Sequence, residues 1–259
     1  MNNMAVYRKP IFDEVRRLLG RGFTKSEVSR IDSAIDRALS IPSDRAGDRL
    51  GALSEQFESG GRGAGTVSSG AGDSGGVSYG IYQLASKTGT VATFIKTEGA
   101  TWAADFRSAV PGSEAFSKIW RAVAARDPEE FAEAQHAFIE RTHYRPAVAA
   151  VLKATGLDLD TRHRAVRDVV WSVAVQHGGA GTILNAAVAE VDATLLRSRA
   201  DYDRALIVAI YGQRTGYVLR VAGRSNATAA RTLRSIAESR YPAELKAALD
   251  MLDQPSDTA

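Results

Sequence analysis

The 259-residue sequence has no cysteine, which excludes disulfide bonds and thiolate metal sites and fits a reducing compartment. It also lacks an apolar run near the length of a membrane span, and its first 21 residues contain no apolar signal-peptide core. No block of Lys and Arg alternates with aromatic residues, which argues against nucleic-acid binding. We therefore expect a protein without an integral membrane segment, made in the host cytoplasm.

The composition is that of a folded globular protein. Hydrophobic residues make up 44% of the chain and charged residues 24%, which is enough apolar material for a sizeable core. The formal net charge is only +3, a mild positive charge that suits an acidic surface such as a bacterial envelope.

The N-terminal part reads as two helices. Apolar residues recur at helical spacing over 11–19 and 28–39, and Thr24 and Glu27 have the spacing of a capping box before the second helix. Pro42 lies in a stretch, 40–48, that favours a linker. We expect residues 1–43 to form an accessory helical hairpin and residues 44–259 to form the main domain.

The main domain is predicted to be mainly α, within the α+β class. A helix is expected over about 47–58, and a glycine-rich stretch, 60–80, holds two short β-prone runs at 66–68 and 77–79. Asp127 and Pro128 mark a helix start, and the apolar segment 163–179 predicts a buried central helix. The remaining helices are expected near 181–191, 201–213, 226–239 and 242–252.

Residues 70–76, GAGDSGG, offer two misleading motifs. GDSGG around Ser74 looks like the nucleophile segment of a trypsin-like protease, but all four histidines follow Ser74, whereas that family places its histidine first. The spacing of Gly70, Gly72 and Gly75 also matches a dinucleotide-binding loop, but the segment lies in a loop and leads into a short extended run instead of opening a helix. Neither chemistry is expected here.

No metal or cofactor site is expected. His136 and His143 lie seven residues apart on one predicted helix, but no third ligand accompanies them. Surface or capping positions are the better interpretation of both histidines.

Two carboxylates stand at the glycine-rich stretch, one just before it and one within it. Glu58 ends a predicted helix beside Phe57, where apolar neighbours favour a protonated acid. Asp73 lies on a polar loop, where a carboxylate stays ionised and can activate water. Such a pair is what glycoside hydrolysis requires. The plainer alternatives are a solvated helix-end Glu and a turn Asp.

The segments FESGG at 57–61 and GDSGGVSYGIYQ at 72–83 resemble the lysozyme-like superfamily, as does WSVAVQHG at 171–178. The closer similarity is to phage endolysins and to the muramidase domains of type VI secretion spike proteins. The resemblance spans about residues 46–259. It implies a lysozyme-like fold with a small glycine-rich β lobe.

The resemblance also implies an activity and a site. It implies hydrolysis of the β-1,4 bond between N-acetylmuramic acid and N-acetylglucosamine in bacterial peptidoglycan, without a cofactor, by a monomer released through holin-type lesions or a secretion system. Glu58 takes the place of the family's acid and Asp73 that of its second carboxylate, and an inverting mechanism is expected. The residues implied to bind sugar are Ser78, Tyr79, Gln83, Gln176 and His177. A lytic transglycosylase, a chitosanase and a non-catalytic wall-binding module remain as alternatives.

Overall fold

The computed structural model describes residues 9–24, 27–28, 31, 50–58, 63–70 and 75–254. Its contacts divide the chain into two compact units, Met1–Arg49 and Leu50–Ala259. The expected boundary at residues 43 and 44 lies outside the described residues, as does the expected linker.

The first unit contains helix α1, Lys9–Leu19, which ends at Gly20 in a left-handed conformation. After it, Thr24 and Glu27 form the predicted capping box: the Glu27 amide donates to Thr24 Oγ1 at 3.2 Å, and the Thr24 amide donates to the Glu27 carboxylate at 2.9 Å. Phe12 and Phe23 meet edge to face, which closes the turn between these two segments.

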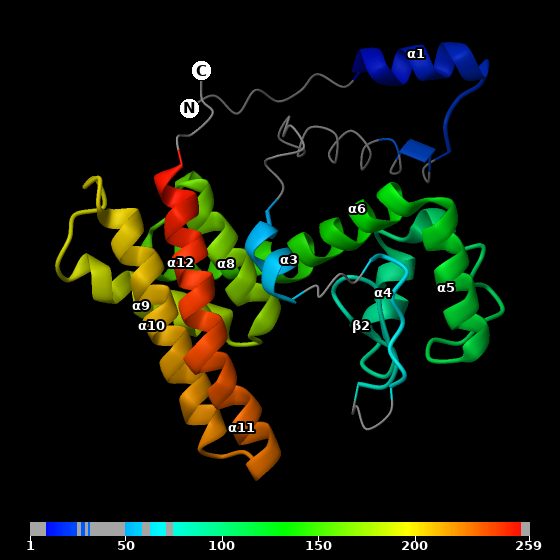
Figure 1. The fold of residues 1–259 in the computed structure, drawn as a ribbon. Helices are drawn as coiled ribbons and strands as arrows, with labels where there is room; N and C mark the ends of the chain where they lie inside the picture. The colour runs from blue at the N-terminus through cyan, green and yellow to red at the C-terminus, as the bar shows by residue number, and fades with distance from the viewer. Residues whose placement is uncertain are drawn as a thin grey trace. The chain divides into compact units, whose positions relative to one another are not determined.

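The second unit is mainly helical, as the apolar patterning predicts (Figure 1). None of its described helices, nor α1, is long and apolar enough to span a membrane. The elements of its first half are α3 (Ala52–Glu58), β1 (Ser78–Tyr79), β2 (Leu84–Ala85), α4 (Thr90–Lys96), η1 (Ala100–Trp102), α5 (Glu114–Arg126) and α6 (Pro128–Ile139).

The second half contains only helices. Its elements are the π-helical turn η2 (Glu140–Tyr144), α7 (Arg145–Thr155), η3 (Leu159–Thr161), α8 (Arg164–Gln176), α9 (Ala180–Asp192), α10 (Tyr202–Ala222), α11 (Ala227–Ser235), a second π-helical turn η4 (Ile236–Arg240) and α12 (Tyr241–Asp253).

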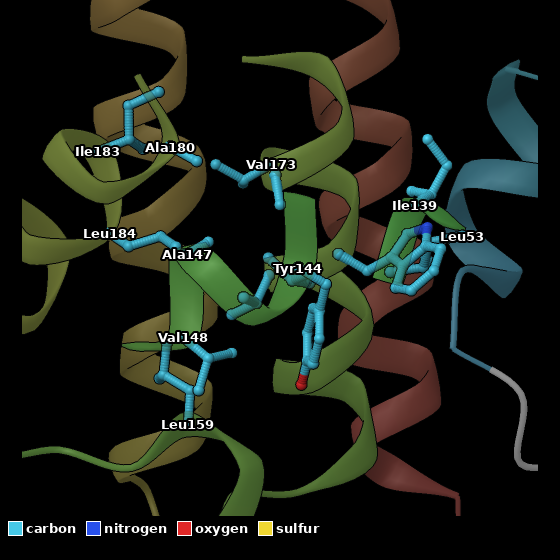
Figure 2. Close-up of a cluster of buried hydrophobic side chains, with 14 of the residues drawn as sticks. Leu53, Ile139, Tyr144, Ala147, Val148, Leu159, Val173, Ala180, Ile183 and Leu184 are labelled. Carbon is cyan, nitrogen blue, oxygen red and sulfur yellow. The ribbon is translucent and has the colours of Figure 1, made fainter. Parts of the chain in front are cut away.

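Helix α8 is the buried central helix that the segment 163–179 predicts. It packs against α3, α9, α10 and α12, and nine of its thirteen residues are buried. Figure 2 shows part of the surrounding core, where side chains of α7, α8 and α9 meet; Leu53 of α3 and Ile139 of α6 belong to the same cluster. The core therefore joins the short helix α3 to the C-terminal helices.

The glycine-rich stretch forms a small antiparallel platform. The predicted β-prone runs pair with each other: the Ser68 amide donates to the Ser78 carbonyl at 2.9 Å, and Val67 bridges Tyr79. Strand β1 then pairs on its other side with β2, in the register Ser78 to Ala85 and Tyr79 to Leu84. This platform bears the predicted residues Ser78 and Tyr79.

Candidate functional site

Helix α3 places Glu58 at its last position. Leu53 and Ser54 are buried in the main body, and Phe57, next to Glu58, is half-buried. The location of Glu58 at a helix end beside a partly buried aromatic residue agrees with the sequence prediction. Asp73 and Ser74 lie outside the described residues, so the pairing of Glu58 with Asp73 stays a prediction.

The first turn of α3 is fixed by a carboxylate from α8. The fully buried Asp168 accepts hydrogen bonds from the amides of Gly51 at 2.5 Å and Leu53 at 2.8 Å. Burial raises the pKa of Asp168, and the two amides oppose that shift. Asp168 therefore satisfies donors that a helix start leaves without partners.

A stacked aromatic pair supports the same turn. The His136 ring lies on the Trp171 indole with centroids 4.3 Å apart, and its Nε2 lies 2.8 Å from the Leu50 carbonyl oxygen. Gly51, at φ +101°, packs against the indole so closely that a Cβ atom would come within 2.9 Å of it. His136 is thus buried, and the surface or capping position expected for it is wrong; the patterning did not show that Leu50 and Trp171 would cover this side chain.

Gln135 ties the β platform to helix α6. This fully buried amide accepts from the Ile81 amide at 3.0 Å and donates to the Ala64 carbonyl at 3.2 Å. Gly80, at φ +75°, leaves room for it, since a Cβ atom there would lie 2.1 Å from Gln135 Oε1. One side chain therefore holds both ends of the glycine-rich stretch.

The three predicted residues of the platform have different environments. Ser78 is buried, and its amide donates to Ser68 Oγ at 2.8 Å. Tyr79 is fully buried against α5, and its hydroxyl accepts from the Gly112 amide at 3.0 Å. Gln83 is exposed, with φ +53°, in the turn between β1 and β2. Of the three, Gln83 is the one open to a ligand, while Tyr79 anchors the platform.

Gln176 and His177 belong to a buried polar network around Arg214 of α10. The Arg214 guanidinium donates to Glu244 Oε2 at 2.8 Å and to His177 Nε2 at 3.2 Å, and it also bonds to Gln176 Oε1. The hydroxyl of Tyr241 donates to Gln176 Oε1 at 3.0 Å. This network joins the end of α8 to α10 and α12.

The network keeps His177 neutral. Burial lowers the pKa of His177 to about 4, and the positive charges of Arg214 and Arg240 act in the same direction. Because Arg214 Nε donates to His177 Nε2, the neutral ring carries its proton on Nδ1.

A pocket of about 240 Å³ opens beside this network. Three residues of the network line it, namely Gln176, His177 and Tyr241. The rest is lined by Gly178, Tyr217, Val218, Val221, Leu233 and Ile236.

The structure thus places the predicted residues in two groups, the platform residues and the pair at the end of α8. Sequence reasoning missed Asp168, Gln135 and Arg214, which organise these groups. The available signal was a charged residue inside a mostly apolar helical segment, as for Arg214 in α10. Among the described residues, no three His, Asp or Glu side chains gather as a metal site would require.

Comparison with known proteins assigns the chain to a family. Residues 50–239 match the family described as type VI secretion system spike protein VgrG3-like, C-terminal. The chain belongs to this family. The type VI secretion system spike protein VgrG3 of Vibrio cholerae is 42% identical to it over 130 residues. That match covers 50% of this chain but only 12% of the Vibrio protein.

Proposed function

We propose that the chain is a peptidoglycan-degrading glycoside hydrolase, an N-acetylmuramidase that cleaves the β-1,4 bond between N-acetylmuramic acid and N-acetylglucosamine. The observation that carries the proposal is the placement of Glu58 at the end of α3, a helix whose first turn is locked onto the main body by Asp168. The carboxyl group that donates the proton must be held at a fixed position relative to the glycosidic bond.

In this proposal Glu58 is the general acid and protonates the leaving oxygen. Asp73 is the general base and removes a proton from the attacking water, which gives inversion at the anomeric carbon. The platform and the end of α8 supply the sugar contacts. Gln83 is exposed, and Gln176 and His177 line a pocket, so these side chains are open to a ligand, whereas Tyr79 is fully buried and holds the platform in place.

Membership of a type VI spike family supports delivery through a secretion system rather than release through membrane lesions. Peptidoglycan is a reachable substrate for a protein delivered in this way. Lysis of the target bacterium would then follow from cleavage of its wall.

Mass spectrometry of digested, purified peptidoglycan tests the proposal. We expect new reducing N-acetylmuramic acid ends from the wild type and a loss of at least 10²-fold in rate for Glu58→Gln, because the amide carries no transferable proton. Glu133→Gln, which changes an exposed carboxylate on α6, is the matched control and should cleave at the wild-type rate.

Other products would indicate other enzymes. Anhydro sugar ends would mean a lytic transglycosylase, and cleavage of chitosan but not peptidoglycan would mean a chitosanase. Binding without any product would leave a wall-binding module. Cleavage at the wild-type rate by Glu58→Gln would show that Glu58 is not the acid.

A further inference from the structure

The distal half of the α10–α11 hairpin holds an unbalanced group of arginines. Between Asp203 and Glu238 the sequence has six arginines and no acidic residue. Arg204 pairs with Asp253, and Arg214 is buried against Glu244. The other four are exposed, and none forms an ion pair with any residue in the described ranges: Arg220, Arg224, Arg231 and Arg234.

These four residues, here called the arginine hairpin, lie close together along the fold. Arg220 is in the last turn of α10, Arg224 is in the turn that follows, and Arg231 and Arg234 are one helical turn apart on α11. Helices α10 and α11 pack against each other. Figure 1 shows their connecting turn at the lower end of the hairpin, beyond the end of α8.

The arginine hairpin holds enough positive charge to exceed the net charge of the whole chain, which is +3. The protein has 33 basic and 30 acidic side chains, so without these four arginines 29 basic side chains face 30 acidic ones. Four solvated guanidinium groups without acidic partners repel one another and add nothing to the core. Their concentration on one structure instead creates a local field that attracts anions.

The chemistry of the surface favours carboxylates on a polymer over a lipid bilayer. Guanidinium groups bind carboxylates through two parallel hydrogen bonds. A helix that enters a membrane interface typically exposes aromatic and large apolar residues. The large apolar side chains exposed on α10 are aliphatic and only partly open, namely Val208, Leu219 and Val221.

We propose that the arginine hairpin is a docking surface for the carboxylates of the peptide stems of peptidoglycan, separate from the site that cleaves the glycan. The identity of the polymer rests on the proposed function. Each stem carries free carboxylates at intervals along the wall, so several arginines can be engaged at once. Docking of this kind would hold the enzyme on the insoluble wall between cleavage events.

Co-sedimentation with purified sacculi tests this surface. All proteins carry Glu58→Gln, so that the sacculi stay intact during the measurement. Replacing all four arginines of the hairpin with Gln should raise the apparent Kd at least tenfold at low salt and flatten its dependence on salt. The matched control removes four exposed basic side chains elsewhere, by Arg107→Gln, Lys118→Gln, Arg121→Gln and Lys153→Gln, and should stay within twofold of the wild type.

A second measurement needs no variant of the hairpin. Sacculi whose carboxylates have been converted to amides should bind the otherwise unchanged protein at least tenfold more weakly. Circular dichroism and thermal unfolding of the fourfold Gln variant should match the wild type, because all four side chains are solvated.

Three results would overturn the inference: unchanged binding after the fourfold replacement, equal losses in the control, or unchanged binding to amidated sacculi. Arginine-dependent binding to phosphatidylglycerol vesicles but not to sacculi would assign the surface to a membrane. The binding result is independent of catalysis. Arginine-dependent binding, with no sugar cleavage by the wild type, would refute the proposed function alone. Cleavage by the wild type without arginine-dependent binding would refute the docking surface alone.

Discussion

Removing the Asp168 carboxylate should loosen α3 and misplace Glu58. In Asp168→Ala the amides of Gly51 and Leu53 lose their acceptors in a buried position. An unsatisfied buried donor costs about 1–3 kcal/mol, so the two together should lower the free energy of unfolding by about 2–6 kcal/mol. Asp168→Asn keeps one acceptor oxygen and should cost less, about 1–3 kcal/mol.

Chemical denaturation measures the stability, and steady-state hydrolysis of soluble peptidoglycan fragments measures the effect on catalysis. Both variants should be assayed well below their unfolding midpoints. We expect kcat to fall more than KM rises, since the acid moves while the sugar contacts on the platform remain. Asp158→Ala, which removes a half-buried carboxylate that caps η3, is the matched control and should cost about 1 kcal/mol with kcat unchanged.

Two outcomes would refute this reasoning. If Asp168→Ala unfolded within about 0.5 kcal/mol of the wild type, the two hydrogen bonds would not be holding α3. If kcat fell only in proportion to the fraction of unfolded protein, Asp168 would be a stabilising residue without a role in placing Glu58.

Two further predictions follow from the site. Inversion with Asp73 as the base predicts that proton NMR detects the α-anomer first, and that azide partly rescues Asp73→Asn; a first-formed β-anomer would contradict it. Because the folded pKa of His177, about 4, lies below its ordinary value of 6.5, the unfolded chain binds the proton first and stability falls as the pH drops from 6.5 to 4. His177 contributes at most about 3 kcal/mol to that fall. The variant His177→Gln should remove this part of the dependence of the free energy of unfolding on pH, measured by denaturation at several pH values. An unchanged dependence would assign it to other groups.

Local patterns predicted local structure well. The capping box of Thr24 and Glu27 forms as its spacing indicates, and the β-prone runs 66–68 and 77–79 pair across the glycine-rich stretch. The apolar segment 163–179 becomes the buried helix α8. Each of these depends on residues close in sequence, or on a single strongly apolar segment.

Helix α10 shows where local patterns fail. The helix expected over 201–213 continues to Ala222 through Gly212 and Gly216. Glycine lowers helix propensity by about 1 kcal/mol, but the burial of Arg214 and Val218 against neighbouring helices outweighs that local cost. Only the tertiary contacts reveal this.

Two polar residues at helix starts, Asp127 and Asn226, differ in whether they cap their helix. Asp127 stands at the predicted start of α6, but its side chain makes no capping bond there and instead accepts from the Trp102 indole at 2.7 Å. Asn226, which by pattern alone opens a glycosylation sequon, caps α11 through the Ala229 amide at 2.9 Å. The partner of Asn226 lies three residues along the chain, whereas the partner of Asp127 lies 25 residues away and depends on packing.

The two parts of the proposed activity share one support, helix α8. Asp168 in its first half holds the start of α3, and Gln176 at its end joins the Arg214 network that fixes α10 and α12. These two residues are eight positions apart, about 12 Å along the helix. The helix that carries Glu58 and the helix that leads into the arginine hairpin therefore both pack against helix α8. A wall strand docked on the hairpin and the proposed acid Glu58 would therefore be connected through the same helix.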